Sequence, residues 1–250
     1  MRKILKKLVQ FYLKILTKFT LWRHQPLIVA VAGTTGKTFT KEAILEELRR
    51  DDFVSARGNP RSFNTEIGLP LAVLFLPSGY RSFFRWANIL SIGTYVSLLE
   101  RRFPKVLVLE MGVDRKGDMR YLLSLVRPKI VILTTIDQSF PDNNTTLDDI
   151  ENEMRELVRA IPKDGLLILN GLDKRVRSLQ KETVARSLVY GFDSQCSVKI
   201  ENIKENDSGQ VFEIWQEGKK ERVETFKFGD HTVTALTAAK ILAREIKKFI

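Results

Sequence analysis

The stretch from Val29 to Thr40 constrains the fold of this 250-residue chain most, and its sequence is Val-Ala-Val-Ala-Gly-Thr-Thr-Gly-Lys-Thr-Phe-Thr. A β-branched apolar run enters a turn that holds Gly33 and Gly36, and the chain leaves it as a helix beginning near Lys37. Glycine lets backbone N–H groups approach an anion where a side chain would clash. The order of strand, glycine loop and helix therefore predicts a phosphate-binding loop. The alternative is an ordinary glycine turn before a helix.

The other residues of the loop have chemistry that suits a nucleotide phosphate. Thr34 and Thr35 lie between the glycines, where their backbone N–H groups can face the anion. Lys37 can reach the terminal phosphates as a point charge, and the Thr38 hydroxyl can ligate Mg²⁺. The longer Walker spacing is not met, because Val31 stands where its first glycine would be.

Five further segments follow the loop, and one of them has a glutamate near the end of a predicted strand. The segments are Asn64–Pro70, Val106–Gly112, Arg127–Ile136, Lys163–Asp173 and Gly229–Ala239. Glu110 lies at the carboxyl end of a predicted buried strand, where a second Mg²⁺ anchor commonly stands beside a phosphate loop. In this order the segments resemble the central ATP-binding domain of the Mur ligases, most closely the UDP-N-acetylmuramoyl-tripeptide–D-alanyl-D-alanine ligase branch. The resemblance covers about residues 27–245.

The resemblance implies a chemistry and a set of site residues. Mur ligases use ATP to phosphorylate a carboxylate, and an amino group then attacks the acyl phosphate to form an amide. The implied catalytic residues are Lys37 and Glu110. The implied nucleotide-binding residues are Gly33, Thr34, Thr35, Gly36, Lys37, Thr38, Asn64, Asn170, Asp173 and His231. The implied Mg²⁺-binding residues are Thr38, Thr65 and Glu110. His231 has an alternative role as a capping or packing residue, because Thr232 and Ala235 replace the asparagines of the family motif around it.

Three positions depart from the family pattern. Arg115 stands where this branch has a histidine, Phe140 replaces a histidine that binds a second metal, and Met154 replaces a carbamylated lysine. Phe and Met cannot ligate a hard cation. Three acids lie near enough in sequence to substitute: Asp137, Asp142 and Glu153.

The resemblance leaves two functions open. Complete ligases also have an N-terminal domain for the UDP-sugar and a C-terminal domain for the incoming amino acid, and both are expected to be absent here. The first interpretation is an ATP-dependent acid–amino-acid ligase of peptidoglycan precursor synthesis. It would act on a UDP-muramoyl peptide, with a separate chain supplying the missing domains. The alternative is a membrane-associated nucleotide-binding pseudoenzyme or scaffold that has lost ligation.

Residues 1–25 form a basic segment that is predicted to be one amphipathic helix. They hold seven Lys or Arg and no acid, whereas the rest of the chain is nearly balanced, with 34 basic and 30 acidic residues. A general nucleic-acid surface is therefore not indicated. Its predicted apolar face holds Ile4, Leu5, Leu8, Phe11, Tyr12, Ile15, Leu16 and Phe19. This composition favours residues 1–23 lying on an anionic membrane surface. The protein is then expected to be cytoplasmic and peripheral at the inner face of the membrane. The alternative is a helix packed on the domain or in an oligomer.

Residues 26–250 are predicted to form the ATP-binding domain, with an α/β fold. Strands at 27–33, 53–56, 106–111, 129–135 and 166–170 alternate with helices at 37–50, 68–76, 82–101, 118–126 and 147–160. This rhythm predicts a mostly parallel sheet with helices on both faces. Residues 187–228 are expected to add a small antiparallel β subdomain of four strands, before a closing helix at 232–249. The apolar segment 77–104 is expected to be a core helix or a second membrane-contacting element.

Overall fold

The computed structural model describes residues 3–50, 54–60, 63–79, 82–137 and 145–250. Their strands are β1 (Leu27–Ala32), β2 (Ala56–Gly58), β3 (Val106–Met111), β4 (Ile130–Leu133), β5 (Leu166–Asn170), β6 (Arg186–Gly191), β7 (Val198–Asn206), β8 (Gly209–Gln216) and β9 (Lys219–Thr225). The helices are α1 (Lys3–His24), α2 (Lys37–Arg50), α3 (Gly68–Val73), α4 (Phe83–Leu99), α5 (Asp118–Leu123), α6 (Leu147–Arg159), α7 (Lys174–Ser178) and α8 (Asp230–Glu245). Short 3₁₀ turns at Leu179–Glu182 and Ile246–Lys248 follow α7 and α8.

The described strands form one sheet in the order β2-β3-β1-β4-β5-β6-β7-β8-β9. From β2 to β7 every neighbouring pair is parallel, and β7, β8 and β9 pair antiparallel. The predicted α/β class with a mostly parallel sheet is confirmed. Because β1 lies between β3 and β4, the chain changes direction across the sheet at β1, where α/β proteins form a ligand crevice outside the carboxyl ends of the strands.

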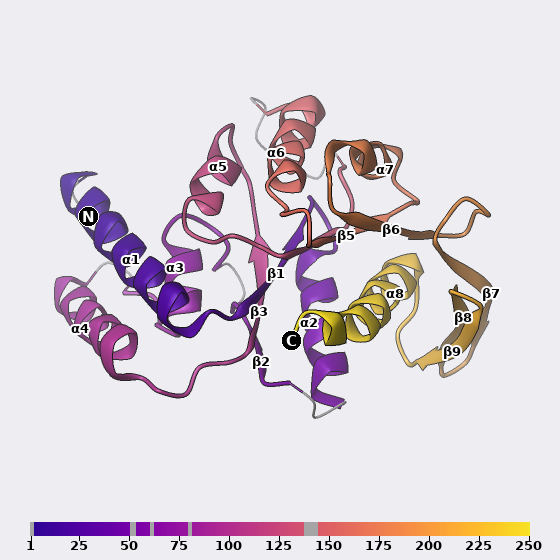
Figure 1. Ribbon diagram of the computed structural model, residues 1–250, viewed down its shortest axis with the longest axis horizontal. Coiled ribbons are helices and arrows are strands. Elements are labelled where there is room, and N and C mark those ends of the chain that lie inside the picture. The colour runs from indigo at the N-terminus through magenta and orange to yellow at the C-terminus, as the bar shows by residue number, and fades with distance from the viewer. Residues whose placement is uncertain (1–2, 51–53, 61–62, 80–81, 138–144) are drawn as a thin grey trace.

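Alternate residues of the strands face two separate cores. Ala30 and Leu109 pack with α3, α5 and α6 on one face, whereas Val31 and Val108 pack with α2 and α8 on the other. Figure 1 shows α5, α6 and α7 above the sheet and α2 and α8 below it. Burial on both faces explains why these strands have continuous apolar sequences.

One predicted pairing is wrong. The strand expected at Ser187–Phe192 was placed in the antiparallel subdomain of residues 187–228, but β6 pairs parallel with β5, from Leu166 opposite Arg186 to Asn170 opposite Tyr190. The helix α7, which the sequence analysis does not predict, crosses over and brings the chain back in the same direction. The antiparallel part therefore begins at β7.

Several element ends also differ from the prediction. The second strand begins at Ala56 instead of residue 53, and α3 ends at Val73 instead of residue 76. Phe75, with a positive φ of 60°, prevents the helix from continuing to Pro77. The closing helix begins two residues earlier than predicted, at Asp230.

Helix α1 packs on the domain by a stripe that the prediction did not single out. Val9, Leu13 and Leu16 are buried against α3 and α4, in a third apolar cluster that includes Leu74 and Trp86. Leu16 therefore belongs to the buried stripe, although it was predicted to lie on the apolar face with Phe11. The rest of that predicted face is exposed. The alternative of a helix packed on the domain therefore holds for one side of α1, and the membrane contact of its exposed side stays a prediction.

Candidate nucleotide-binding site

The loop between β1 and α2 has the backbone form that the glycines predict. Gly33 and Gly36 have positive φ values of 136° and 79°. A Cβ at Gly33 would lie 2.3 Å from Thr134 Oγ1 and 2.8 Å from the carbonyl oxygen of Thr135. No side chain fits there, because the loop presses against the end of β4. The glycine is therefore required by both conformation and space.

The hydroxyls of the loop are held by Asp137, which follows β4. The Thr34 hydroxyl donates to Asp137 Oδ1 and accepts from the Asp137 backbone N–H, each at 2.8 Å. The Thr35 hydroxyl donates to Asp137 Oδ2, also at 2.8 Å. The Thr34 N–H also donates to the Thr135 carbonyl at 2.7 Å. This carboxylate therefore fixes the shape of the loop.

Lys37 folds back over the loop. Its ammonium donates to the Thr34 carbonyl at 2.6 Å. Burial lowers the pKa of Lys37, while the carboxylates of Glu110, Asp114 and Asp137 raise it. A partly buried ammonium is costly without an anion, so the site favours a ligand that brings negative charge.

Thr38 and Glu110 meet at the carboxyl ends of the neighbouring strands β1 and β3. The Thr38 hydroxyl donates to Glu110 Oε2 at 2.9 Å, and the Asn64 amide donates to Glu110 Oε1 at 3.4 Å. Asn64 lies close to the strand end, since a Cβ on Gly112 would stand 2.6 Å from its Nδ2 atom. Thr38 and Glu110, both expected to bind Mg²⁺, are thus in contact, and their side chains offer hard oxygens of the kind that Mg²⁺ prefers.

Behind Glu110 lies a buried polar group that the sequence analysis missed. The Glu110 N–H donates to Asn59 Oδ1 at 2.8 Å, and Asn59 Nδ2 donates to the Glu110 carbonyl at 3.1 Å. The ammonium of Lys41, which has no exposed surface, donates to the Asn59 carbonyl at 2.5 Å. Asn59 and Lys41 therefore position the strand end that carries Glu110. The signal available in the sequence was Lys41 itself, a charged residue on the apolar side of α2.

A cavity of about 570 Å³ opens beside the loop, at the carboxyl ends of β4 and β5. Its lining includes the predicted residues Thr35, Gly36, Asn170, Asp173 and His231. Gly33, Thr34, Lys37, Thr38, Asn64, Thr65 and Glu110 are not among the lining residues. The predicted residues thus divide into a phosphate-side group around Lys37 and a group around the cavity.

Asp173 is a structural cap as well as part of the cavity wall. Its Oδ1 accepts from the N–H groups of Arg175 and Val176, and its Oδ2 accepts from the N–H of Ile136 at 2.7 Å. Asn170 similarly accepts from the N–H of Leu172 and donates to Thr135 Oγ1 at 3.4 Å. Both side chains tie β5 to the end of β4.

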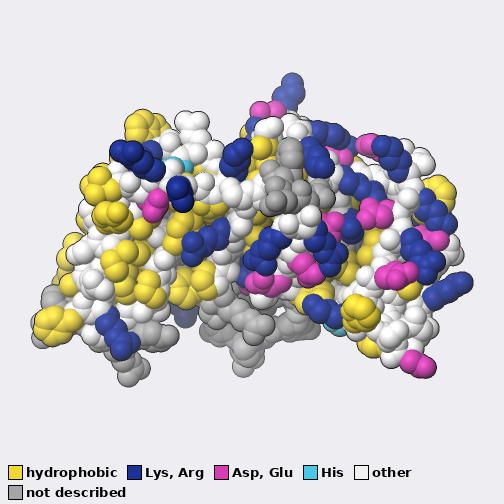
Figure 2. All heavy atoms as spheres, turned by 90° about the horizontal axis from the view of Figure 1, so that it is seen from below, with side chains coloured by type: hydrophobic (Ala, Val, Ile, Leu, Met, Phe, Trp, Pro, Cys, Tyr) yellow, Lys and Arg dark blue, Asp and Glu magenta, His cyan; other side chains and the backbone are white. Residues whose placement is uncertain are grey.

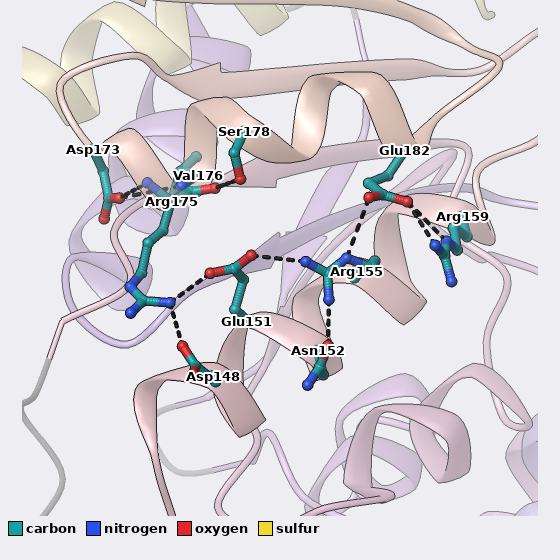
Figure 3. Close-up of polar contacts among 10 residues, drawn as sticks. All are labelled: Asp148, Glu151, Asn152, Arg155, Arg159, Asp173, Arg175, Val176, Ser178 and Glu182. Atoms are coloured by element: carbon teal, nitrogen blue, oxygen red, sulfur yellow. Dashed lines mark hydrogen bonds and ion pairs between the residues drawn. The ribbon is translucent and has the colours of Figure 1, made fainter.

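Ion pairs hold α7 against α6 beside this wall (Figure 3). The Arg175 guanidinium contacts Asp148 at 2.7 Å and Glu151 at 2.6 Å. Glu151 also pairs with Arg155 at 2.8 Å, and Arg155 reaches Glu182 at 3.3 Å. The hydrogen bonds that the Arg175 guanidinium donates to Asp148 and Glu151 raise the pKa of Arg175. These ion pairs therefore fix α7, which Asp173 caps, against α6.

His231 lies at the opposite edge of the cavity, in the first turn of α8. Its ring meets the Phe39 ring edge-on at 5.7 Å, and the Lys227 ammonium lies 4.6 Å from the Phe39 centroid. Packing on Phe39 supports the alternative role for His231, while its place in the lining keeps the nucleotide role open. Thr65 is next to Asn64, and its carbonyl accepts from the N–H of Leu69 at the start of α3.

The described positions that depart from the family pattern have surroundings of their own. Met154 lies in α6 and is fully buried in the core between the sheet and the helices α5 and α6. Glu153, considered as a substitute ligand, accepts from the N–H groups of Gly117 and Met119 at 2.7 and 2.8 Å. It serves as an anchor for the start of α5. The Arg115 N–H donates to Asp118, and Phe140 and Asp142 lie outside the described residues.

Across the described ranges, no three His, Cys, Asp or Glu side chains come together in a group that could hold a metal ion. A metal at Glu110 would need other oxygen ligands, such as Thr38 and phosphate oxygens. Mg²⁺ is commonly held in this way, by one or two carboxylates with substrate phosphates and water.

More than half of this chain matches a known protein family. The family described as Mur ligase middle domain matches residues 87–243. The UDP-N-acetylmuramoyl-tripeptide–D-alanyl-D-alanine ligase of Bacillus subtilis (strain 168) is 26% identical over 187 residues, which is 75% of this chain and 35% of that protein.

Solved structures agree on the fold. A crystal structure of MurF from Acinetobacter baumannii matches with a TM-score of 0.76 and 18% identity, over 96% of this chain and 47% of that one. The MurF ligase of Thermotoga maritima in complex with ADP matches with a TM-score of 0.74 and 20% identity, over 96% and 49%. The chain thus spans between about a third and a half of the length of these relatives.

Proposed function

Because the chain belongs to the Mur ligase family through its middle domain, we propose that it binds Mg-ATP at the loop of residues 33–38 and the adjoining cavity. The observation that carries the proposal is the contact between Thr38 and Glu110 at the ends of β1 and β3. It joins a helix-start hydroxyl and a strand-end carboxylate beside a lysine, the constellation that a metal–phosphate complex needs.

The residues around the loop have distinct proposed roles. The N–H groups of Gly33–Gly36 and the ammonium of Lys37 bind the phosphates. Thr38, Glu110 and Thr65 hold Mg²⁺, which neutralises phosphate charge when bound, and Asn64 orients Glu110. Asn170, Asp173 and His231 border the space for the rest of the nucleotide.

The proposed reaction is ATP-dependent formation of a C–N bond. A substrate carboxylate oxygen attacks the γ-phosphorus, ADP leaves, and an acyl phosphate forms. An amino group then attacks the acyl carbon, inorganic phosphate leaves, and the nitrogen loses a proton. By analogy with its relatives, the carboxylate would belong to a UDP-muramoyl peptide, as in cell-wall peptidoglycan precursor synthesis. The domains that the relatives have beyond the matched region would be supplied by a separate chain.

A second function has its own support. Met154 is buried in the core and has no oxygen to offer a hard cation, and the Glu153 carboxylate already accepts from the N–H groups at the start of α5. The alternative is therefore a nucleotide-binding pseudoenzyme or scaffold that holds Mg-ATP without ligation.

Residues 1–23 are proposed to bring the protein to an anionic membrane surface, on the cytoplasmic side. The support is the excess of basic residues in this segment and the exposed apolar side of α1. Among the described residues, no helix combines the length and apolarity needed to cross a bilayer.

Calorimetric titration of ATP with and without Mg²⁺ tests the binding site. Thr38→Val and Glu110→Gln should remove most of the Mg²⁺-dependent gain in affinity, while Glu205→Gln, an exposed site on β7, should not. Equal Mg²⁺ dependence in all variants would contradict the metal assignment. Phosphate release that depends on both UDP-muramoyl tripeptide and D-alanyl-D-alanine would then exclude the scaffold, since a scaffold that has lost ligation consumes no ATP with these substrates.

A further inference from the structure

Two helices at one end of the molecule expose apolar side chains that the proposed nucleotide site does not use. Trp22 is 70% exposed, Phe84 is 83% exposed and Leu99 is 61% exposed. The apolar platform consists of Ile4, Leu8, Phe11, Tyr12, Ile15, Phe19 and Trp22 from α1, with Phe84, Ile92, Tyr95, Leu98 and Leu99 from α4. Figure 2 shows hydrophobic side chains gathered over this end of the molecule. Exposed apolar side chains in this number on one face indicate a binding surface.

The two helices form one continuous surface, joined by hydrogen bonds. At the seam between them, Tyr12 Oη and Thr94 Oγ1 are 2.7 Å apart. Beneath the seam the Thr20 hydroxyl donates to Ser97 Oγ at 3.0 Å, and Arg23 donates to the Ser97 carbonyl at 3.1 Å. The buried stripe of α1 fixes it to the domain, so that the platform needs no rearrangement to be presented.

The charges beside the platform are mainly positive, although Glu100 directly follows Leu99 at the end of α4. Neither α1 nor α4 contains an acidic residue, and the first acid in the chain is Glu42. Lys6, Lys7 and Lys18 of α1 are exposed, as is Arg85 of α4. A ligand of this surface must therefore combine apolar material with negative charge.

We propose that the apolar platform binds the interface of an anionic lipid bilayer, with α4 inserting beside α1. Tyr and Trp suit this depth, because their rings are apolar and their polar tips stay in the headgroup layer. Lysines at the border meet anionic headgroups. A second copy of this chain is disfavoured as the occupant, because its identical platform would bring lysines against lysines.

The inference rests on the proposed membrane contact of residues 1–23 and extends it to a second helix. It also changes the suitable experiment. Deleting residues 1–23 would uncover Leu74 and Trp86 of the third cluster, so loss of binding in that variant would not distinguish unfolding from loss of contact. Exposed positions on α4 avoid this difficulty.

The test is co-sedimentation of the full chain with vesicles of phosphatidylcholine containing about 30% phosphatidylglycerol. The variant Phe84→Gln/Tyr95→Gln/Leu99→Gln should have a partition coefficient onto these vesicles that is at least about tenfold lower. The matched control Phe226→Gln/Trp215→Gln removes exposed aromatic rings from the antiparallel end and should bind like the unchanged chain. Trp22 fluorescence, measured as the difference from Trp22→Phe, should shift to the blue on binding.

The outcomes separate the inference from the proposal beneath it. If the unchanged chain fails to bind anionic vesicles at low salt, both the membrane contact and the platform are wrong. If it binds and the α4 variant binds equally well, only the role of α4 is wrong. If the α4 variant instead converts a dimer to a monomer in sedimentation velocity, the occupant is a second copy. An unchanged affinity for Mg-ATP and an unchanged circular dichroism spectrum show that the variant is folded.

Discussion

The nucleotide site and the apolar platform differ in what a ligand would find there: polar groups that are already hydrogen-bonded at the site, and apolar side chains that are uncovered at the platform. Around the loop, the chain satisfies its own polar groups, since Asp137 holds Thr34 and Thr35 and Glu110 accepts from Thr38. At α1 and α4, apolar side chains such as Phe84 remain uncovered. A phosphate ligand would have to replace contacts that already exist, whereas a lipid surface would cover area that nothing else covers. Binding of a phosphate ligand is therefore governed by charge and geometry, whereas binding of a lipid surface is governed by apolar area.

The largest expected effect comes from the loop. Gly33→Ala should lower the free energy of unfolding by about 3–5 kcal/mol, because its Cβ would overlap Thr134 and the backbone of Thr135 in a left-handed conformation. Gly117→Ala is the matched control, since Gly117 has a positive φ of 91° and nothing within 4 Å of the added Cβ. It should cost about 1 kcal/mol. Urea denaturation measures both, and equal costs would contradict the close packing of the loop on β4.

The two sides of α1 should respond differently to truncation. Leu13→Ala removes a side chain with no exposed surface and should cost about 2–4 kcal/mol in the free energy of unfolding. Leu8→Ala truncates a side chain that is 61% exposed and should change stability by less than about 0.5 kcal/mol. Vesicle binding should show the reverse order, because Leu8→Ala removes an exposed apolar side chain and should weaken binding more than Leu13→Ala does. If both variants unfold at the same urea concentration, the assignment of Leu13 to the buried side of α1 and of Leu8 to the exposed side is contradicted.

A smaller effect is expected behind Glu110. Asn59→Ala leaves the buried N–H of Glu110 without its acceptor, which should cost about 1–3 kcal/mol of stability. Because Asn59 positions Glu110, the variant should also lose affinity for Mg-ATP more than for ATP alone. Asn88→Ala, at an exposed position of α4, is the control. Loss of stability with an unchanged Mg²⁺ dependence would leave Asn59 a structural role only.

The smallest effect concerns pH at the end of α1. Burial lowers the pKa of His24, and the neighbouring Arg23 lowers it further. The ring stacks on Phe103 at 4.6 Å, and its Nε2 is buried with no hydrogen-bond partner among the described residues. As the pH falls below about 6.5, the unfolded chain takes up a proton that the folded chain resists, so the free energy of unfolding decreases. His24→Phe should flatten the pH dependence of stability between about pH 6.5 and 5. Parallel curves for the two chains would exclude this role for His24.

The sequence predicts the phosphate side of the site well because its geometry is local. Gly33, Gly36, Lys37 and Thr38 are adjacent in the chain, and their spacing alone determines a strand, a turn and a helix start. Glu110 was predictable because parallel strands bring their carboxyl ends to one edge. Asn59 and Asp137 were not predicted as partners of these residues, since their contacts depend on how separate loops fold over the strand ends.

The errors in the fold have a similar cause. The direction of β6 depends on the crossover through α7, a helix of five residues that is too short to give a periodic pattern. The burial of Leu13 in α1 could not be separated from the exposure of Phe11, because both sides of that helix are apolar. Periodicity identifies an apolar face but does not say whether protein or another medium covers it.

Calorimetric titration of Mg-ATP into the full chain and into Lys37→Ala tests the central claim most directly. The unchanged chain should bind one Mg-ATP, and Lys37→Ala should bind at least about tenfold more weakly, because a charge-assisted contact worth about 1.4 kcal/mol or more is lost. Lys204→Ala, an exposed lysine on β7, should bind like the unchanged chain. Equal affinity in all three proteins, or no heat of binding in the unchanged chain, would contradict a nucleotide site at residues 33–38.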